Sequence, residues 1–165
     1  MKLSVIYQPS VRASASPYRL RDEDGGKLDW ANAFLDAQCL RQLSPRSLRI
    51  YAYDLLDFAR WFGPQHQPLA KITESTIVDY VRHQLGQHRK PRPQTVNHRL
   101  GTVRCCYRFH TGQEVPAGQV HLQRRYIKRS PLGYGRPRTA IARGLRLKQD
   151  RHVIVPLSAE EVAKF

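Results

Sequence analysis

The sequence predicts an all-α fold built around four helices, and three observations support this prediction. Apolar residues recur at helical spacing in four separate stretches between residues 28 and 112. Residues that favour helix ends, Ser or Thr before a stretch and Gly or Pro after it, bound most of these stretches. From residue 113 to residue 155 the helical periodicity is lost.

The chain begins with a stretch that lacks this periodicity. Residues 1–27 mix Ser, Ala, Pro and Arg and end in an acidic, Gly-rich turn, so we expect a flexible N-terminal arm. A short amphipathic helix is predicted next, over residues 28–40. Its apolar side chains, among them Leu28, Ala31 and Phe34, keep helical spacing.

The clearest pattern lies in residues 43–62. Ser44 is placed to cap a helix and Pro45 to occupy its first position, while Gly63 and Pro64 end it. One face of this helix is apolar over roughly 120° and needs a core. For a single such helix, the simpler interpretation of the other face is a solvated basic surface, although it also suits phosphate oxygens and base edges. That face gathers Arg46, Arg49, Tyr53 and Arg60.

A third helix is predicted over residues 73–86, with Thr73 as its N-cap and Gly86 at its end. The connector that follows is constrained by prolines and is strongly basic. We include three of its residues among the candidate phosphate contacts: Arg89, Lys90 and Arg92.

The fourth helix is predicted from Pro93 to His110, with an exit at Gly112. Its apolar face opposes a polar stripe about 40° wide. Gly101 lies beside this stripe, which indicates either close approach of a backbone or a helix-packing contact. Because two helices now oppose an apolar face to an Arg-rich face, a nucleic-acid surface becomes the favoured interpretation. The stripe consists of Asn97, Arg104 and Arg108.

The charge of the chain supports this interpretation. Its 28 Lys and Arg against 13 Asp and Glu give a net charge of +15. Glu114 is the only acid between Tyr80 and Gln149, so the positive potential is concentrated there. Nucleic acid is the commonest partner of such a chain, while RNA and an anionic membrane surface stay open as alternatives.

The C-terminal third is predicted to hold two parts. Residues 113–155 suggest a long basic interdomain linker with short possible strands at 119–127 and 151–155. In residues 156–165, Ser158 and Glu161 are spaced as a capping box, which predicts the start of a helix. Four linker residues join the candidate DNA contacts: Arg124, Arg125, Lys128 and Arg129.

The sequence offers no pattern for a metal, a cofactor, a small-molecule substrate or a membrane span. Cys106 and His110 lie four residues apart on the fourth helix, but two ligands do not make a zinc site. Three cysteines without a C-x-x-C pair suit a reducing cytoplasm, so we expect a cytoplasmic, nucleoid-associated protein.

These stretches resemble the core-binding domain of tyrosine recombinases, the phage integrase family. The likeness rests on the residues around Leu43-Ser44-Pro45-Arg46, on Gln94-Thr95-Val96-Asn97, and on Pro156-Leu157-Ser158-Ala159-Glu160-Glu161, which is similar to the start of the catalytic domain. The resemblance implies a SAM-like bundle of four or five helices that clamps duplex DNA.

The resemblance also implies what this chain lacks. In the family, a separate catalytic domain supplies a nucleophilic tyrosine and the cations around the phosphate, and no residue here matches those motifs. We therefore expect a DNA-binding part of a recombinase with a truncated catalytic domain, inactive alone, whose partners are duplex DNA and other protomers. The rival interpretations are a stand-alone helical DNA-binding regulator and an RNA-associated basic protein. The latter is disfavoured because aromatic residues mostly occupy the apolar helix faces.

Overall fold

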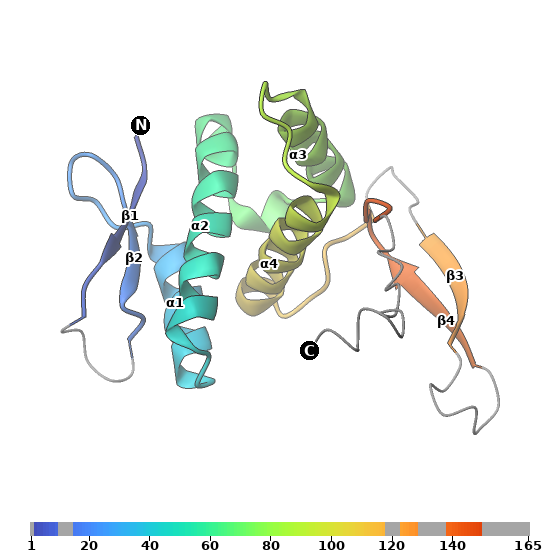
Figure 1. Cartoon of the computed structure of the whole chain (residues 1–165), viewed down its shortest axis with the longest axis horizontal. Coiled ribbons are helices and arrows are strands. Elements are labelled where there is room, and N and C mark those ends of the chain that lie inside the picture. The colour runs from blue at the N-terminus through green and yellow to red at the C-terminus, as the bar shows by residue number, and fades with distance from the viewer. Residues whose placement is uncertain (1, 10–14, 118–122, 129–137, 150–165) are drawn as a thin grey trace, which may run out of the picture.

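The computed structural model describes residues 2–9, 15–117, 123–128 and 138–149. A bundle of four helices forms its centre, with one two-stranded antiparallel hairpin before the bundle and another after it (Figure 1). The helices are α1 (Asp29–Leu40), α2 (Pro45–Phe62), α3 (Glu74–Gly86) and α4 (Pro93–Thr111). Two short 3₁₀ turns, η1 (Gly63–Gln65) and η2 (Leu69–Lys71), connect α2 to α3.

The capping signals act as the sequence predicts at α2 and α3. The Ser44 hydroxyl accepts the Ser47 N–H, and Pro45 occupies the first helical position of α2. Thr73 and Thr76 form a reciprocal capping box at α3. These side chains satisfy N–H groups that would otherwise lack a partner in the first turn, which fixes where each helix begins.

The helix ends are also close to the predicted positions. Gly112 takes a left-handed φ of 70° after α4, as expected for a C-cap glycine. Gly63 does not do the same after α2, because it keeps a right-handed φ of −53° and the chain continues into η1. The left-handed residue there is His66, with φ of 49°.

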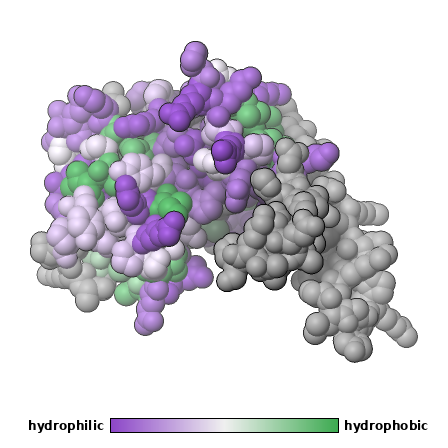
Figure 2. Space-filling model, viewed as in Figure 1, coloured by the Kyte–Doolittle hydropathy of each residue, from purple (hydrophilic) through white to green (hydrophobic). Residues whose placement is uncertain are grey.

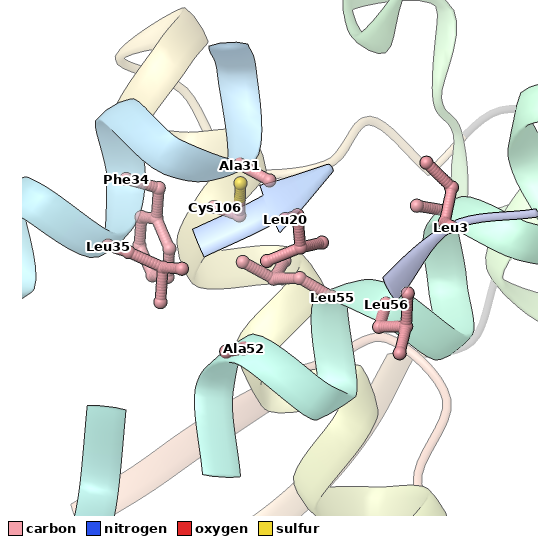
Figure 3. Packing of buried hydrophobic residues seen from close by; sticks show 10 residues of the cluster. Leu3, Leu20, Ala31, Phe34, Leu35, Ala52, Leu55, Leu56 and Cys106 are labelled. Carbon is pink, nitrogen blue, oxygen red and sulfur yellow. The ribbon is translucent and has the colours of Figure 1, made fainter. Parts of the chain in front are cut away.

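Two apolar clusters hold the bundle together. The first joins α1, α2 and the N-terminal hairpin, and Figure 3 shows Leu20 of that hairpin beside Leu55 of α2. The second lies between α2, α3 and α4 and is built around three aromatic rings, Phe58, Phe62 and Tyr80. Because Phe58 belongs to α2 and Val96 and Leu100 to α4, this cluster positions the two helices whose polar faces are in question.

The N-terminal residues differ from the flexible arm that the sequence predicts. Strand β1 (Ser4–Tyr7) pairs antiparallel with β2 (Tyr18–Arg21). Leu3 and Leu20 are buried, and Asn32 of α1 binds both backbone groups of Leu20, with the Leu20 N–H at 2.9 Å and its carbonyl at 3.1 Å. Burial of these leucines and satisfied backbone groups stabilise the hairpin against the bundle.

The predicted linker also contains secondary structure, so the all-α prediction is incomplete. Strands β3 (Gln123–Lys128) and β4 (Arg138–Arg143) form a second antiparallel hairpin, which overlaps the possible strand at 119–127. After β4 the chain returns to the bundle over residues 144–149, where Leu145 and Leu147 pack against the second apolar cluster. The strand suggested at 151–155 and the helix at 156–165 lie outside the described residues.

Candidate nucleic-acid interface

The polar face of α2 presents its side chains to solvent. Arg46, Arg49 and Tyr53 are all exposed, and Tyr53 keeps 48% of its accessible surface. The Arg49 guanidinium lies 5.8 Å from the centre of the Tyr53 ring, a cation–π contact that orients the arginine without neutralising it. Within the described residues, neither Arg46 nor Arg49 makes an ion pair. This face therefore keeps its positive charge available to an external anion.

Arg60, the fourth residue of the predicted α2 stripe, has a partner inside the molecule. Its guanidinium donates to the Leu3 carbonyl at 2.7 Å and so fastens the N-terminal hairpin to the end of α2. The stripe thus divides along the helix into an uncommitted N-terminal half and an anchoring residue near the C-terminal end.

The polar face of α4 is engaged by the chain itself. The Asn97 side chain donates to the Leu147 carbonyl at 2.9 Å and accepts the Leu147 N–H at 2.8 Å. Both hydrogen-bonding functions of its amide are therefore used. The same pairing occurs between Asn32 and Leu20 at the other hairpin, where it is structural and buried.

Arg104 is held more firmly still. Its guanidinium forms two bonds with the Glu74 carboxylate, at 2.9 and 3.2 Å, and a third with the Leu145 carbonyl at 3.2 Å. Glu74 in turn accepts the Leu145 N–H at 3.3 Å. The two side chains keep only 20% and 7% of their accessible surface, so this bidentate pair is largely removed from water.

The remaining predicted contacts fall into three groups. Arg108 is exposed and lies 2.8 Å from Glu114, and this hydrogen bond raises the pKa of its guanidinium. Arg89, Lys90 and Arg92 are exposed in the connector that leads into α4. Arg124, Arg125 and Lys128 belong to strand β3, and Arg129 lies outside the described residues.

Sequence reasoning missed the polar contacts that join α2 to α4 and to α3. Asp54 of α2 accepts hydrogen bonds from Thr102 at 2.8 Å and lies 2.6 Å from His98 Nδ1. Burial raises the pKa of Asp54, and the hydrogen bonds from Thr102 and His98 oppose that rise. One turn further, Asp57 accepts a hydrogen bond from the Tyr80 hydroxyl at 2.6 Å. An acidic residue on the apolar side of a predicted helix was the available signal for this network.

Gly101 lies in an open hollow rather than at a tight contact. The hollow, of about 500 Å³, lies between α4 and residues 144–146, and Tyr51 of α2 contributes to its lining. A Cβ atom at Gly101 would meet nothing within 4 Å among the described residues. Neither backbone approach nor helix packing thus explains this glycine.

A second, smaller hollow of about 250 Å³ lies between the N-terminal hairpin and α2. Its lining combines three tyrosines with Arg49 and an aliphatic side chain. Tyr7 and Tyr18 are hairpin residues that sequence reasoning did not single out, because strand pairing alone brings them to α2. The lining residues are Val5, Tyr7, Tyr18, Arg49 and Tyr53.

Cys106 and His110, the two residues weighed as metal ligands, both contact other parts of the bundle. Cys106 is buried in the first apolar cluster, and burial raises the pKa of its thiol to about 12. His110 Nε2 lies 2.8 Å from the Trp30 carbonyl. No group of three potential metal ligands occurs among the described residues. None of the helices there is long and apolar enough to cross a membrane.

The fold and the uncommitted arginines define a small helical-bundle domain with a basic outer face, and Figure 2 shows that hydrophilic residues cover much of one side of it. The sequence matches the family model described as phage integrase, N-terminal SAM-like domain, over residues 33–114. The chain thus belongs to the phage integrase family of tyrosine recombinases, and the helical bundle is its SAM-like domain. Membership implies a role in recombination and an interaction with DNA. No curated protein and no solved structure gave a significant match.

Proposed function

We propose that this chain is the non-catalytic, DNA-binding portion of a site-specific tyrosine recombinase. The observation that carries the proposal is the exposed basic face of α2, where Arg46 and Arg49 have no carboxylate partner within the described residues. Phosphate contacts by such arginines supply sequence-independent affinity and position the protein on the duplex. The exposed connector residues Arg89, Lys90 and Arg92 extend the same electrostatic attraction.

In this proposal the residues of α4 have a reduced role. Asn97 and Arg104 bind residues 145–147 and Glu74, so contact with DNA would require them to exchange partners. We assign these two residues to fastening the segment after β4. Arg108 and the arginines of β3 stay as peripheral phosphate contacts in the proposal.

Residues 156–165 begin a catalytic domain, on the strength of the capping-box spacing of Ser158 and Glu161. The chain by itself is not expected to cleave DNA, because no matching nucleophile and cation set is present in the sequence. It acts on DNA in the cytoplasm, alongside further protomers on the same recombination site.

Binding of the full chain to a fluorescent duplex at several salt concentrations tests the proposal. If Arg46 and Arg49 each contact a phosphate, the R46A/R49A variant should lower the slope of log affinity against log salt by about 1.8, which is 0.9 for each lost contact. The matched control is K71A/R82A, which removes the same charge from exposed positions on η2 and α3.

Two results would overturn the assignment. Equal weakening by both double variants would mean that net charge, rather than the α2 face, explains the affinity. Absence of duplex binding by the unaltered chain would refute the proposed DNA-binding function. A reading frame that continues past Phe165 to a distal tyrosine distinguishes a recombinase from a stand-alone regulator.

A further inference from the structure

The hollow between the N-terminal hairpin and α2 has the chemistry of a site for an unpaired nucleotide. We propose that Tyr7 and Tyr53 form a stacking platform for one exposed base, and that Arg49 binds the phosphate beside it. This inference rests on the proposed DNA-binding function and adds a second kind of DNA structure to it.

The arrangement of the rings is the first support. Tyr7 and Tyr53 keep 59% and 48% of their accessible surface, high values for large aromatic side chains. Tyr7 is paired in register with Tyr18, and their ring centres lie 5.2 Å apart with the planes tilted by 46°. Tyr18 also packs against the first apolar cluster, which fixes the base of the platform. The hairpin therefore holds one exposed ring beside another that α2 supplies.

The positive charge around the hollow favours a nucleotide as its ligand. Arg49 lines the same hollow and lies over the Tyr53 ring, and Arg46 is exposed one turn earlier on α2. No carboxylate lines this hollow among the residues that the structure describes, whereas another hollow beside the hairpin is lined by Asp29 and Asp36. An apolar protein segment would gain little from uncompensated arginines, but a nucleotide offers a flat apolar face and an anion together.

Geometry then favours an unpaired base over a duplex. In a duplex, neighbouring bases cover each base face, so a tyrosine ring can reach only edges, sugars and phosphates. A single-stranded base exposes its face, and stacking on an aromatic ring is tolerant of base identity. Two exposed rings with an adjacent arginine match this requirement.

The experiment compares two DNAs with the full chain. One is a blunt duplex, and the other is the same duplex with a short single-stranded extension. We expect the chain to prefer the extended DNA by about fivefold to hundredfold, the range of one base stacked on an aromatic side chain. Tyr7→Ala should remove most of this preference while leaving binding to the blunt duplex unchanged. Tyr53→Ala also alters the polar face of α2, so it should weaken binding to the extended DNA more than binding to the blunt duplex.

Two further variants separate stacking from other contacts. Tyr7→Phe retains the ring and loses the hydroxyl, so it should keep the preference. Phe109→Ala removes a ring with 45% exposure from α4 and serves as the matched control, which should also keep it. A helical circular dichroism melt checks that each variant is folded.

An extension that lacks bases tests the idea without altering the protein. Abasic nucleotides keep the phosphates but remove the stacking partner, so the preference should disappear. The inference is overturned if the chain binds the blunt, extended and abasic DNAs alike, if the Ala variants retain the preference, or if Tyr7→Phe loses as much as Tyr7→Ala. Failure of duplex binding would instead count against the proposed function.

Discussion

The polar faces of α2 and α4 have the same sequence pattern and different surroundings. Each sets arginines and one hydrogen-bonding side chain opposite an apolar face. On α2, Arg46, Arg49 and Tyr53 reach solvent. On α4, Asn97 and Arg104 bind other parts of the same chain. An Arg-rich stripe thus predicts that an anion or a hydrogen-bond acceptor binds there. It does not predict whether that group belongs to the same chain or to another molecule.

The difference arises from one extended segment. Residues 144–149 follow β4 and pass along α4, where Leu145 and Leu147 contribute apolar contacts and their backbone groups form hydrogen bonds with Glu74 and Asn97. The N-terminal hairpin docks at the other side of the bundle and fastens Arg60, yet it leaves the first half of the α2 stripe uncovered. Four experiments test this contrast.

Removal of Arg104 should have the largest effect on stability. Arg104→Ala leaves the Glu74 carboxylate, with 7% of its side-chain surface exposed, without its bidentate partner. We expect a loss of about 3 kcal/mol in the free energy of unfolding, measured by urea denaturation. Arg108→Ala removes an exposed charge from the same helix and should leave stability unchanged. A stable Arg104→Ala protein with weaker DNA binding would restore α4 as a DNA contact.

Two asparagines form hydrogen bonds with the backbone of a leucine, and the stability lost on replacing each should increase with the burial of that leucine. Asn32→Ala leaves the buried Leu20 N–H without its acceptor, while the Leu20 carbonyl keeps the Leu28 N–H, at a cost of about 2 kcal/mol. Asn97→Ala should cost about 1 kcal/mol, because the half-buried Leu147 can recover bonds with water. Urea denaturation gives both values. Unchanged stability in Asn97→Ala together with altered base preference would contradict a fastening role.

The buried link between the two helices predicts a pH dependence. Because the folded pKa of Asp54 is raised by burial, the folded chain holds this proton above pH 3.8 while the unfolded chain releases it. Stability from Asp54 therefore falls as pH rises from about 3.8 through the folded pKa. Asp54→Asn removes this fall. The free energy of unfolding of the variant should therefore increase relative to that of the unaltered chain as pH rises through that window. Urea denaturation at several pH values measures this. A difference in unfolding free energy between the two proteins that stays constant with pH would contradict the expected pH dependence.

Thiol labelling should give the smallest but most local signal. At pH 8 the exposed Cys105 should react with iodoacetamide, while Cys106 should not, because its thiol is buried and has a pKa of about 12. Ile50→Cys places a reporter on the α2 face, where Ile50 is 42% exposed. Duplex DNA should slow labelling at position 50 and leave Cys105 unaffected, as read by mass spectrometry. Protection of Cys105 would mean that DNA covers α4.

Local signals in the sequence were sufficient for the helices but not for the partners of their polar faces. Ser44, Thr73 and Gly112 predict helix ends because caps act within a few residues. The partners of Asp54 carry no such local signal, since Thr102 and His98 lie on another helix. The same is true of Tyr7, which joins Tyr53 only through the strand pairing of the hairpin.

The sequence by itself determined four amphipathic helices, their boundaries, the basic character of the chain and its resemblance to recombinase core-binding domains. Only the tertiary structure decided which basic face stays open, because an extended segment such as 144–149 has a weak local pattern and gains its stability from contacts made far along the chain. Asn97 and Leu147 are hydrogen-bonded although they lie fifty residues apart in the sequence, and the sequence pattern around either residue does not predict this contact. Helix formation depends on neighbours in sequence, whereas the use of a helix surface depends on what the folded chain brings to it.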